Sequence, residues 1–200
     1  NNSKVIPARL FGVKKETGAK IEFLLVKRID GDKWETMVRP GKRIKPGDIV
    51  SFSDDSLFEA EVLGFGDEET RIVEFKYEGL FAEKLEEIGR IPLPPYIGRE
   101  STSEDKERYQ TVYAKELGSA AAPTAGLHFT PELMDTLRKE GVRFAEVTLH
   151  VGLGTFRPVK EDDILDHKMH SEWYSVSEET ARLIRETKAA GRRVIAVGTT

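Results

Sequence analysis

The first hydrophobic pattern in the chain is a series of short apolar stretches separated by turn residues. Gly, Pro and Asp recur between these stretches and favour tight turns, because they supply or tolerate the backbone angles that turns need. The stretches lie at residues 5–11, 21–26, 34–38, 49–52, 58–63 and 72–77. About six short strands joined by tight turns predict a small antiparallel β-barrel, which we place at residues 9–78.

From residue 79 the spacing of apolar residues becomes helical. Helices are predicted at residues 80–88, 101–113, 130–140 and 177–190. Their starts carry recognisable caps: Ser101 is followed by Glu104, and Thr130 by Pro131. Alternating residues at 144–151 predict a strand between helices. Strands that alternate with helices predict a mixed α/β domain, formed by residues 1–8 and 79–200, into which the barrel is inserted.

The apolar run at residues 192–197 is typical of a buried parallel strand. Such a strand is normally followed by another element, yet only Gly198, Thr199 and Thr200 come after it. The chain also begins with Asn1. We therefore expect a chain that is truncated at both ends.

Composition narrows the classes of function. There are 31 Lys and Arg residues against 35 Asp and Glu, for a net charge of −4, which excludes a basic coat over the whole protein but not a local basic patch. The absence of Cys excludes thiolate zinc sites, iron–sulfur clusters and cysteine nucleophiles, and favours a reducing compartment. No apolar run approaches the roughly 18 residues of a membrane span, so no membrane partner is expected.

All 4 histidines of the chain fall within residues 128–170. They are His128, His150, His167 and His170. Imidazole titrates near neutral pH, so a cluster of this kind indicates proton transfer or metal binding. A zinc site would use His167 and His170 with a third ligand from His150, Asp163 or Glu172, but no His-Glu-x-x-His pattern supports it. Histidines that merely cap helices or bond within the core are the other interpretation.

Two loops contain candidate ligand-binding residues. The first follows the predicted strand 144–151 and includes Gly152, Gly154, Thr155, Phe156 and Arg157. Glycine allows the backbone to approach a ligand closely, although the third glycine of a dinucleotide fingerprint is missing and a plain turn explains the segment too. The second loop, residues 120–130, leads into a helix N-terminus that favours an anion; a tightly packed loop is the alternative.

Seven segments taken together carry a resemblance to a known family. They are residues 5–10, 93–97, 107–114, 121–130, 149–159, 167–172 and 197–200. In this order they closely resemble the S-adenosylmethionine:tRNA ribosyltransferase-isomerases of queuosine biosynthesis, over essentially the whole chain. The strings Gly-Leu-His-Phe-Thr and His-Val-Gly-Leu-Gly-Thr-Phe-Arg-Pro-Val are distinctive of that family. Departures are mild: Ser3-Lys4 replaces the usual Thr-Arg, and Ala120 the usual Val.

The resemblance implies an α/β domain with an inserted β-barrel and a transferase-isomerase activity. The donor would be S-adenosylmethionine, a co-substrate that gives its ribosyl unit; no metal or separate cofactor is implied. The acceptor would be the 7-aminomethyl-7-deazaguanine base at the wobble position of a tRNA, and the products epoxyqueuosine-tRNA, adenine and methionine. A cytoplasmic monomer is expected.

Roles for individual residues are our inference from this chemistry. His128 and His150 are candidates for proton transfer, with His167, His170 and Glu172 as a second acid–base or adenine-contacting group. Phe129 or Phe156 would contact the sulfonium or a base, and Arg157 the methionine carboxylate or a phosphate. The remaining candidates for the nucleoside pocket are Gly152, Gly154, Thr155, Thr199 and Thr200.

A protein of negative net charge needs local positive surface to bind tRNA. The candidates are Arg9, Arg39, Lys42, Arg43, Arg90 and Arg99. Two rival functions remain open at this point: a metal-dependent hydrolase built on the histidine cluster, and a non-catalytic RNA-binding module built on the barrel.

Overall fold

The computed structural model describes residues 1–55, 57–67, 70–152, 163, 165 and 172–198. The chain forms two compact units. The first, Ile6–Lys106, holds the barrel, and the second is made of Asn1–Val5 and Glu107–Thr200. The fold is mixed α/β with a closed antiparallel barrel, as the sequence predicts. The division falls after residue 106, later than the predicted domain boundary at 78.

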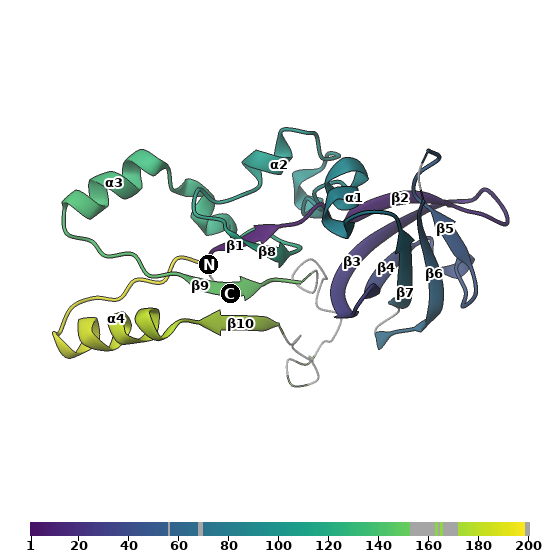
Figure 1. Cartoon of the computed structure of the whole chain (residues 1–200). Coiled ribbons are helices and arrows are strands. Elements are labelled where there is room, and N and C mark those ends of the chain that lie inside the picture. The colour runs from purple at the N-terminus through teal and green to yellow at the C-terminus, as the bar shows by residue number, and fades with distance from the viewer. Residues whose placement is uncertain (56, 68–69, 153–162, 164, 166–171, 199–200) are drawn as a thin grey trace. The chain divides into compact units, whose positions relative to one another are not determined.

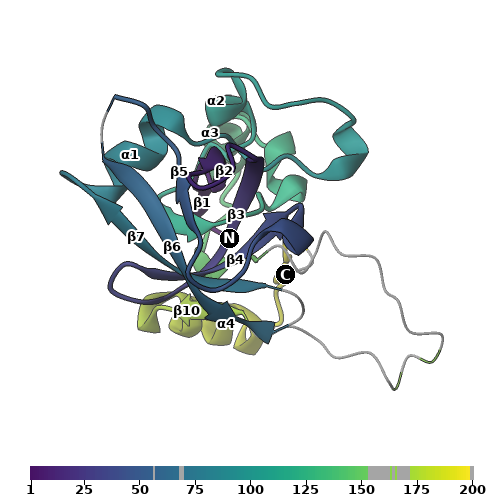
Figure 2. The same cartoon turned by 90° about the vertical axis from the view of Figure 1, so that its right-hand side faces the viewer.

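Six strands form the barrel unit's sheet (Figures 1 and 2). They are β2 (Arg9–Lys14), β3 (Lys20–Asp30), β4 (Lys33–Arg39), β5 (Ile49–Ser51), β6 (Phe58–Phe65) and β7 (Arg71–Tyr77). The sheet closes in the order β2-β3-β4-β7-β6-β5, and every neighbouring pair is antiparallel. Alternate residues of each strand point inward, which is why the strands show alternating burial and why the turn-punctuated pattern predicts them.

Aromatic side chains fill the barrel. Phe23, Phe58 and Phe75 are almost completely buried, and Phe58 stacks on Phe75 with ring centroids 5.6 Å apart. Closure of the sheet depends on Gly12 in β2. A Cβ at Gly12 would lie only 2.5 Å from the backbone oxygen of Ser51 in β5, so the two strands approach this closely because residue 12 has no side chain.

The helix that follows the barrel strands packs on the same core. Helix α1 (Phe81–Ile88) buries Leu85, and its Phe81 ring stacks on Trp34 at 5.4 Å. Gly89 caps its end, as predicted. These aromatic contacts explain why the compact unit extends beyond residue 78. The short helical turns η1 (Gly41–Arg43) and η3 (Pro95–Ile97) also belong to this unit.

The predicted helix at 101–113 is wrong in its extent. Only α2 (Asp105–Arg108) forms, and the cap is not the predicted pair Ser101 and Glu104. Instead the buried Asp105 carboxylate accepts the Thr102 N–H at 2.7 Å and both guanidinium nitrogens of Arg99 at 2.6 and 2.7 Å. The cap is therefore formed by Thr102 and Asp105, one residue later than predicted. Asp105 is suited to this buried position because the Arg99 guanidinium neutralises its carboxylate.

The described part of the second unit contains two small sheets and the helices α3 and α4 (Figure 1). Its elements are β1 (Ser3–Val5), β8 (Glu116–Ser119), η4 (Thr124–His128), α3 (Pro131–Lys139), β9 (Val147–His150), β10 (Trp173–Val176) and α4 (Glu178–Ala189). Strand β1 pairs in parallel with β8, and β9 in antiparallel fashion with β10. The predicted strand at 5–11 is therefore two strands, β1 and β2, that belong to different units and are separated at Pro7.

Side-chain amides replace missing backbone partners in this unit. The Asn1 amide accepts the Leu149 N–H and donates to the Leu149 carbonyl, both at 3.0 Å. The Gln110 amide does the same for Val5, both at 2.9 Å. A carboxamide carries the same donor and acceptor as a peptide group, so each extends a strand edge without a strand. Gln110 lies inside the predicted helix at 101–113 but beyond the end of α2.

The predicted caps of the two longer helices are confirmed. Thr130 Oγ1 accepts the Leu133 N–H at 3.2 Å, and Ser177 Oγ accepts the Thr180 N–H at 3.1 Å. On α3, Met134 is buried whereas the adjacent apolar residue Leu133 is 42% exposed, so the buried face of this helix is narrow.

The predicted buried strand at 192–197 is wrong for this structure. No strand forms there, and Ile195 is 73% exposed. The apolar side chains at 192–197 favour burial, but a strand also needs a neighbouring strand that pairs with its backbone N–H and C=O groups. No strand pairs with this segment among the described residues.

Candidate functional site

His150 and Trp173 bring the ends of β9 and β10 together. The two residues are directly opposite each other in the antiparallel register. Their rings stack with centroids 4.9 Å apart and planes inclined by 19°. Trp173 keeps 59% of its surface exposed, while the imidazole is half-buried. The pair thus places a titratable ring beside an open aromatic surface.

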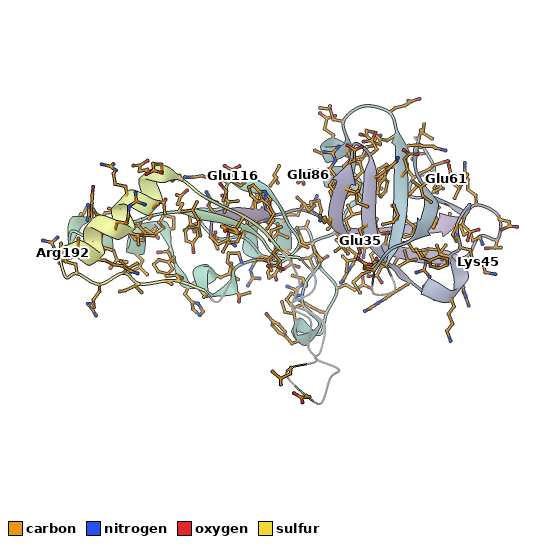
Figure 3. All side chains as sticks on the ribbon, turned by 90° about the horizontal axis from the view of Figure 1, so that it is seen from below. Glu35, Lys45, Glu61, Glu86, Glu116 and Arg192 are labelled. Carbon is orange, nitrogen blue, oxygen red and sulfur yellow. The ribbon has the colours of Figure 1, made fainter. Side chains whose placement is uncertain are left out.

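Burial controls the protonation of His150. Its Nδ1 atom is inaccessible to solvent and has no hydrogen-bond partner within the described part of the chain. Desolvation lowers the pKa of His150 below its ordinary value of 6.5, and the Glu116 carboxylate (labelled in Figure 3) opposes this only in part. Burial therefore favours the neutral imidazole, which is the form able to accept a proton.

A glycine without a side chain makes room for this ring. A Cβ on Gly118, at the end of β8, would lie 2.8 Å from the His150 Cε1. The φ angle of Gly118 is +144°, a value that other residues rarely adopt. Backbone geometry in β8 therefore fixes where the imidazole sits in β9.

Glu172 holds the start of the first predicted glycine loop. Its Oε1 accepts the Gly152 N–H at 2.9 Å, across the gap between the two strand ends. Because Glu172 directly precedes Trp173, and Gly152 follows His150 by two residues, a carboxylate and an imidazole lie at the same end of one small sheet. This arrangement joins three of the residues singled out in the sequence.

Ser119 was missed in the sequence analysis. Its hydroxyl is completely buried, accepts the Val151 N–H at 3.1 Å and lies 2.7 Å from the Ala121 carbonyl oxygen, to which it donates. The Ala120 N–H also donates to Val151, at 2.9 Å. These bonds attach the end of β8 to the segment after His150. A lone hydroxyl inside a run of small apolar residues is the signal that a sequence reader has for such a residue.

His128 lies elsewhere in the same unit. It is exposed at the end of η4, and its Nδ1 is 3.1 Å from the Ala125 carbonyl oxygen. Over the described ranges, no hydrogen bond or ring contact joins it to His150 or Glu172. The neighbouring Phe129 is half-buried between the Tyr113 and Phe144 rings, with centroids 6.4 and 6.5 Å away. The roles predicted for His128 and Phe129 stay predictions.

Several predicted site residues lie outside the described residues. They are Gly154, Thr155, Phe156, Arg157, His167, His170, Thr199 and Thr200. His167 and His170, the two central ligands of the predicted zinc site, are in this group. Among the described residues, no group of three or more His, Asp or Glu side chains is placed to hold a metal ion.

Three of the cations predicted to bind tRNA are in ion pairs. Arg9 pairs with Glu22 at 3.2 Å. Arg90 pairs with Glu100 at 3.0 Å. Arg99 is bound bidentately by Asp105, as described above, and thus has a structural partner.

The other three predicted cations are Arg39, Lys42 and Arg43. All three are exposed at or beside η1, and none is ion-paired with a described carboxylate. The structure therefore separates the six candidates into a paired and an unpaired set.

The fold and the site together define a mixed α/β protein in which a closed six-stranded barrel accompanies a strand-end imidazole and carboxylate. The family model described as "Queuosine biosynthesis protein" matches residues 1–200, and the chain belongs to this family. Among solved structures, the chain is similar to the S-adenosylmethionine tRNA ribosyltransferase of Thermotoga maritima, at 35% identity and a TM-score of 0.35. That match covers 96% of this chain and 47% of the Thermotoga chain, so the chain spans about half the length of this relative. In the part of the chain described, no helix is both long and apolar enough to cross a membrane.

Proposed function

We propose that this protein transfers the ribosyl moiety of S-adenosylmethionine to a tRNA and isomerises it there. The acceptor is the 7-aminomethyl-7-deazaguanine base at the wobble position, and the products are epoxyqueuosine-tRNA, adenine and methionine. Family membership over residues 1–200 supports the assignment to queuosine biosynthesis. The name of the Thermotoga relative supports S-adenosylmethionine as donor and tRNA as acceptor. S-Adenosylmethionine acts as a co-substrate, and we propose no metal or separate cofactor.

The observation that carries the proposal is the half-buried imidazole of His150, which stacks on Trp173 at the same strand ends as Glu172. The reaction needs a base that removes a proton from the ribose carbon next to the sulfonium, where the positive sulfur makes the carbon acidic. A base for this step must be unprotonated at working pH, and burial lowers the pKa of His150 in the required direction. The hydrogen bond from the Gly152 N–H to Glu172 fixes the backbone at Gly152, the first of the proposed glycine contacts to the substrate.

The remaining chemistry needs further proton transfers. The carbanion formed beside sulfur expels the ribose ring oxygen, and collapse at the carbon that carries adenine leaves an aldehyde and releases adenine, which takes up a proton. The neutral acceptor amine adds to the new carbon–carbon double bond and loses a proton. The carbon beside sulfur then bonds to the aldehyde carbon, and the resulting alkoxide displaces the methionine thioether, which leaves with the C–S electron pair as the epoxide closes. Each proton transfer is assisted by a group that titrates near neutral pH, and such assistance is worth about 10²- to 10⁴-fold in rate.

We assign these further roles on chemical grounds. His128 is the second proton-transfer candidate, and His167 and His170 join Glu172 as an acid–base or adenine-contacting group. The proposed substrate contacts are Phe129, Gly152, Gly154, Thr155, Phe156, Arg157, Thr199 and Thr200. A tRNA substrate also places the protein in the cytoplasm, where we propose that it acts as a monomer.

The deciding experiment is incubation of the protein with adenine-labelled S-adenosylmethionine and precursor tRNA, followed by chromatography. Free adenine, formed only when the tRNA carries the 7-aminomethyl-7-deazaguanine base, is the expected product. Adenine that appears equally without tRNA indicates simple hydrolysis and contradicts the proposal. Activity that requires stoichiometric zinc supports the metal-dependent hydrolase, and tRNA binding without any adenine release supports the non-catalytic RNA-binding module.

A further inference from the structure

The barrel unit carries a groove on its outer surface. The cavity has a volume of about 640 Å³, within the roughly 300–1,000 Å³ of ligand sites. Residues of β2 and β3 line it, together with residues 51–54 and the side chains of Arg39 and Arg90. The strand register places Phe11, Glu22 and Arg39 in one row across β2, β3 and β4. His150, Glu172 and Trp173 are not among the residues that line the groove.

An exposed aromatic ring lies in this groove. Phe11 is 46% exposed, although an apolar side chain of this size is normally buried. The Arg90 guanidinium carbon is 5.0 Å from the centroid of the Phe11 ring. Nucleobases stack on both aromatic rings and guanidinium planes, so the pair forms a stacking surface for an unpaired base.

The carboxylates of the groove are largely neutralised. Glu22 is paired with Arg9 at 3.2 Å, and Glu100 with Arg90 at 3.0 Å. Asp54 is the remaining carboxylate in the lining. Of the three carboxylates in the lining, only Asp54 has no ion-pair partner among the described residues. The repulsion of an anionic ligand is therefore reduced.

Cations dominate the rest of the surface. Lys20 and Arg39 line the groove, and neither is ion-paired with a carboxylate in the described ranges. From Arg39 the chain continues into a loop that carries Lys42, Arg43 and Lys45 without any acidic residue between them; Figure 3 labels Lys45 on this loop. Positive charge thus extends from the groove along the connection between β4 and β5, which suits a ligand with several phosphates.

A buried cation fixes the shape of this loop. Arg71 is only 8% exposed and donates to the carbonyl oxygens of Gly41 at 3.0 Å and Thr70 at 2.9 Å. Its Nε also donates to the carbonyl oxygen of Ile44, at 3.4 Å. The loop backbone is therefore attached to β7. A loop held in this way presents its lysines and arginines with less entropy to lose on binding.

From these features we infer that the groove and the loop bind a single-stranded segment of RNA. One unpaired base stacks on the Phe11–Arg90 pair, and the flanking phosphates contact Lys20 and Arg39 and then the loop cations. The inference rests on the proposed function, because tRNA supplies the RNA. It adds to that function a recognition surface on the barrel for unpaired nucleotides, distinct from the site of ribosyl transfer.

The test is a binding titration with a fluorescein-labelled anticodon stem-loop RNA, without S-adenosylmethionine, using the whole chain. Phe11→Ala and Phe11→Leu are expected to weaken binding about tenfold, whereas Phe11→Trp, which keeps the stacking surface, restores it. Arg39→Glu is expected to weaken binding at least tenfold and to lower the slope of log affinity against log salt by roughly 0.7 per lost phosphate contact. Lys33→Glu, at the opposite end of β4, is the matched control and should change affinity less than twofold.

Thermal unfolding of each variant verifies that these exposed substitutions leave the fold intact. Wild-type affinity in both Phe11→Ala and Arg39→Glu overturns the inference, and so does equal weakening by Lys33→Glu. Preferential binding of polyglutamate over RNA also overturns it and indicates an acidic protein partner. The adenine-release assay distinguishes the two proposals. If the Phe11→Ala and Arg39→Glu variants release adenine with an unchanged KM for tRNA, RNA binding by the groove is contradicted while the proposed function is supported.

Discussion

The imidazole of His150 stacks on the indole of Trp173, with ring centroids 4.9 Å apart and an interplanar angle of 19°. Twenty-two positions of sequence lie between the two residues, and the antiparallel pairing of β9 with β10 places them opposite each other. The Trp173 indole covers one face of the His150 imidazole and shields it from water. Trp173 has no titratable group, yet in this position it influences the protonation of His150.

Replacing Trp173 with Ala should raise the pKa of His150 toward its ordinary value of 6.5, because the imidazole regains solvent. An NMR titration of the imidazole C–H signals measures this, with His150→Gln to assign the resonance. The acid limb of kcat/KM should move to higher pH in the same variant, since a general base works only when deprotonated. An unchanged pKa would show that the indole does not contribute to the desolvation.

The two proton-transfer candidates can be separated by substitution. His150→Gln should lower kcat for adenine release by about 10²- to 10⁴-fold while leaving tRNA affinity nearly unchanged. His128→Ala tests the second candidate in the same assay, and the exposed position of His128 means that the fold should tolerate it. If adenine release survives both changes, the assignment of proton transfer to these histidines is wrong.

Gly118→Ala should disturb the site through geometry alone. The new Cβ would meet the His150 ring at 2.8 Å, and the φ of +144° is unfavourable for alanine, so we expect a loss of about 1–3 kcal/mol in the free energy of unfolding together with reduced turnover. Gly141→Ala is the matched control: its φ is +85°, but no atom lies within 4 Å. A control variant as defective in turnover as Gly118→Ala would contradict the explanation.

Gly12→Ala should weaken closure of the barrel. Its Cβ would lie 2.5 Å from the Ser51 backbone oxygen and 2.7 Å from the Phe52 ring, so β2 and β5 must move apart, at a cost of about 2–3 kcal/mol in the free energy of unfolding. Gly64→Ala in β6 meets no atom within 4 Å and should change stability by less than about 0.5 kcal/mol. Urea unfolding monitored by circular dichroism compares the two, and equal midpoints would refute the close approach.

Asp105→Asn should remove a pH-dependent contribution to stability. The Arg99 guanidinium holds the pKa of the Asp105 carboxyl well below its usual range, with help from the Thr102 N–H and against the effect of burial. A lowered folded-state pKa stabilises the protein above the unfolded pKa of 3.8, and this stabilisation is lost as the pH falls through the folded-state value.

Wild type should therefore be more stable than Asp105→Asn by about 1–3 kcal/mol at pH 7, with the difference narrowing as the pH falls below 4. Part of the Arg99 side chain faces solvent, which favours the lower end of that range. Urea unfolding at a series of pH values provides the measurement. The exposed pair of Arg185 with Glu178 offers a control, since Arg185→Gln should show no such pH dependence. A constant difference between wild type and Asp105→Asn down to pH 2 would argue against the ion pair.

Local signals in the sequence predicted the elements that depend on local chemistry. The barrel strands follow from alternation and turn residues, and the caps at Thr130 and Ser177 from the orphan N–H groups of a helix start. The predicted helix at 101–113 forms only at Asp105–Arg108, and Gln110 instead bonds to Val5, a residue 105 positions away. The role of Ser119 also depends on a distant segment, since its hydroxyl accepts the Val151 N–H from 32 positions further along the chain.

By itself the sequence determined the kinds of element, the barrel, the family and the residue types able to transfer protons, because periodicity, caps and motifs are properties of neighbouring residues. Only the tertiary structure decided that His150, rather than His128, stacks on an aromatic ring and is desolvated. It also decided that Arg99 is bound to a buried carboxylate while Arg39 lines a groove. Burial and ion pairing depend on which distant segments meet, and those meetings set the solvation of a charge and the pKa of an imidazole.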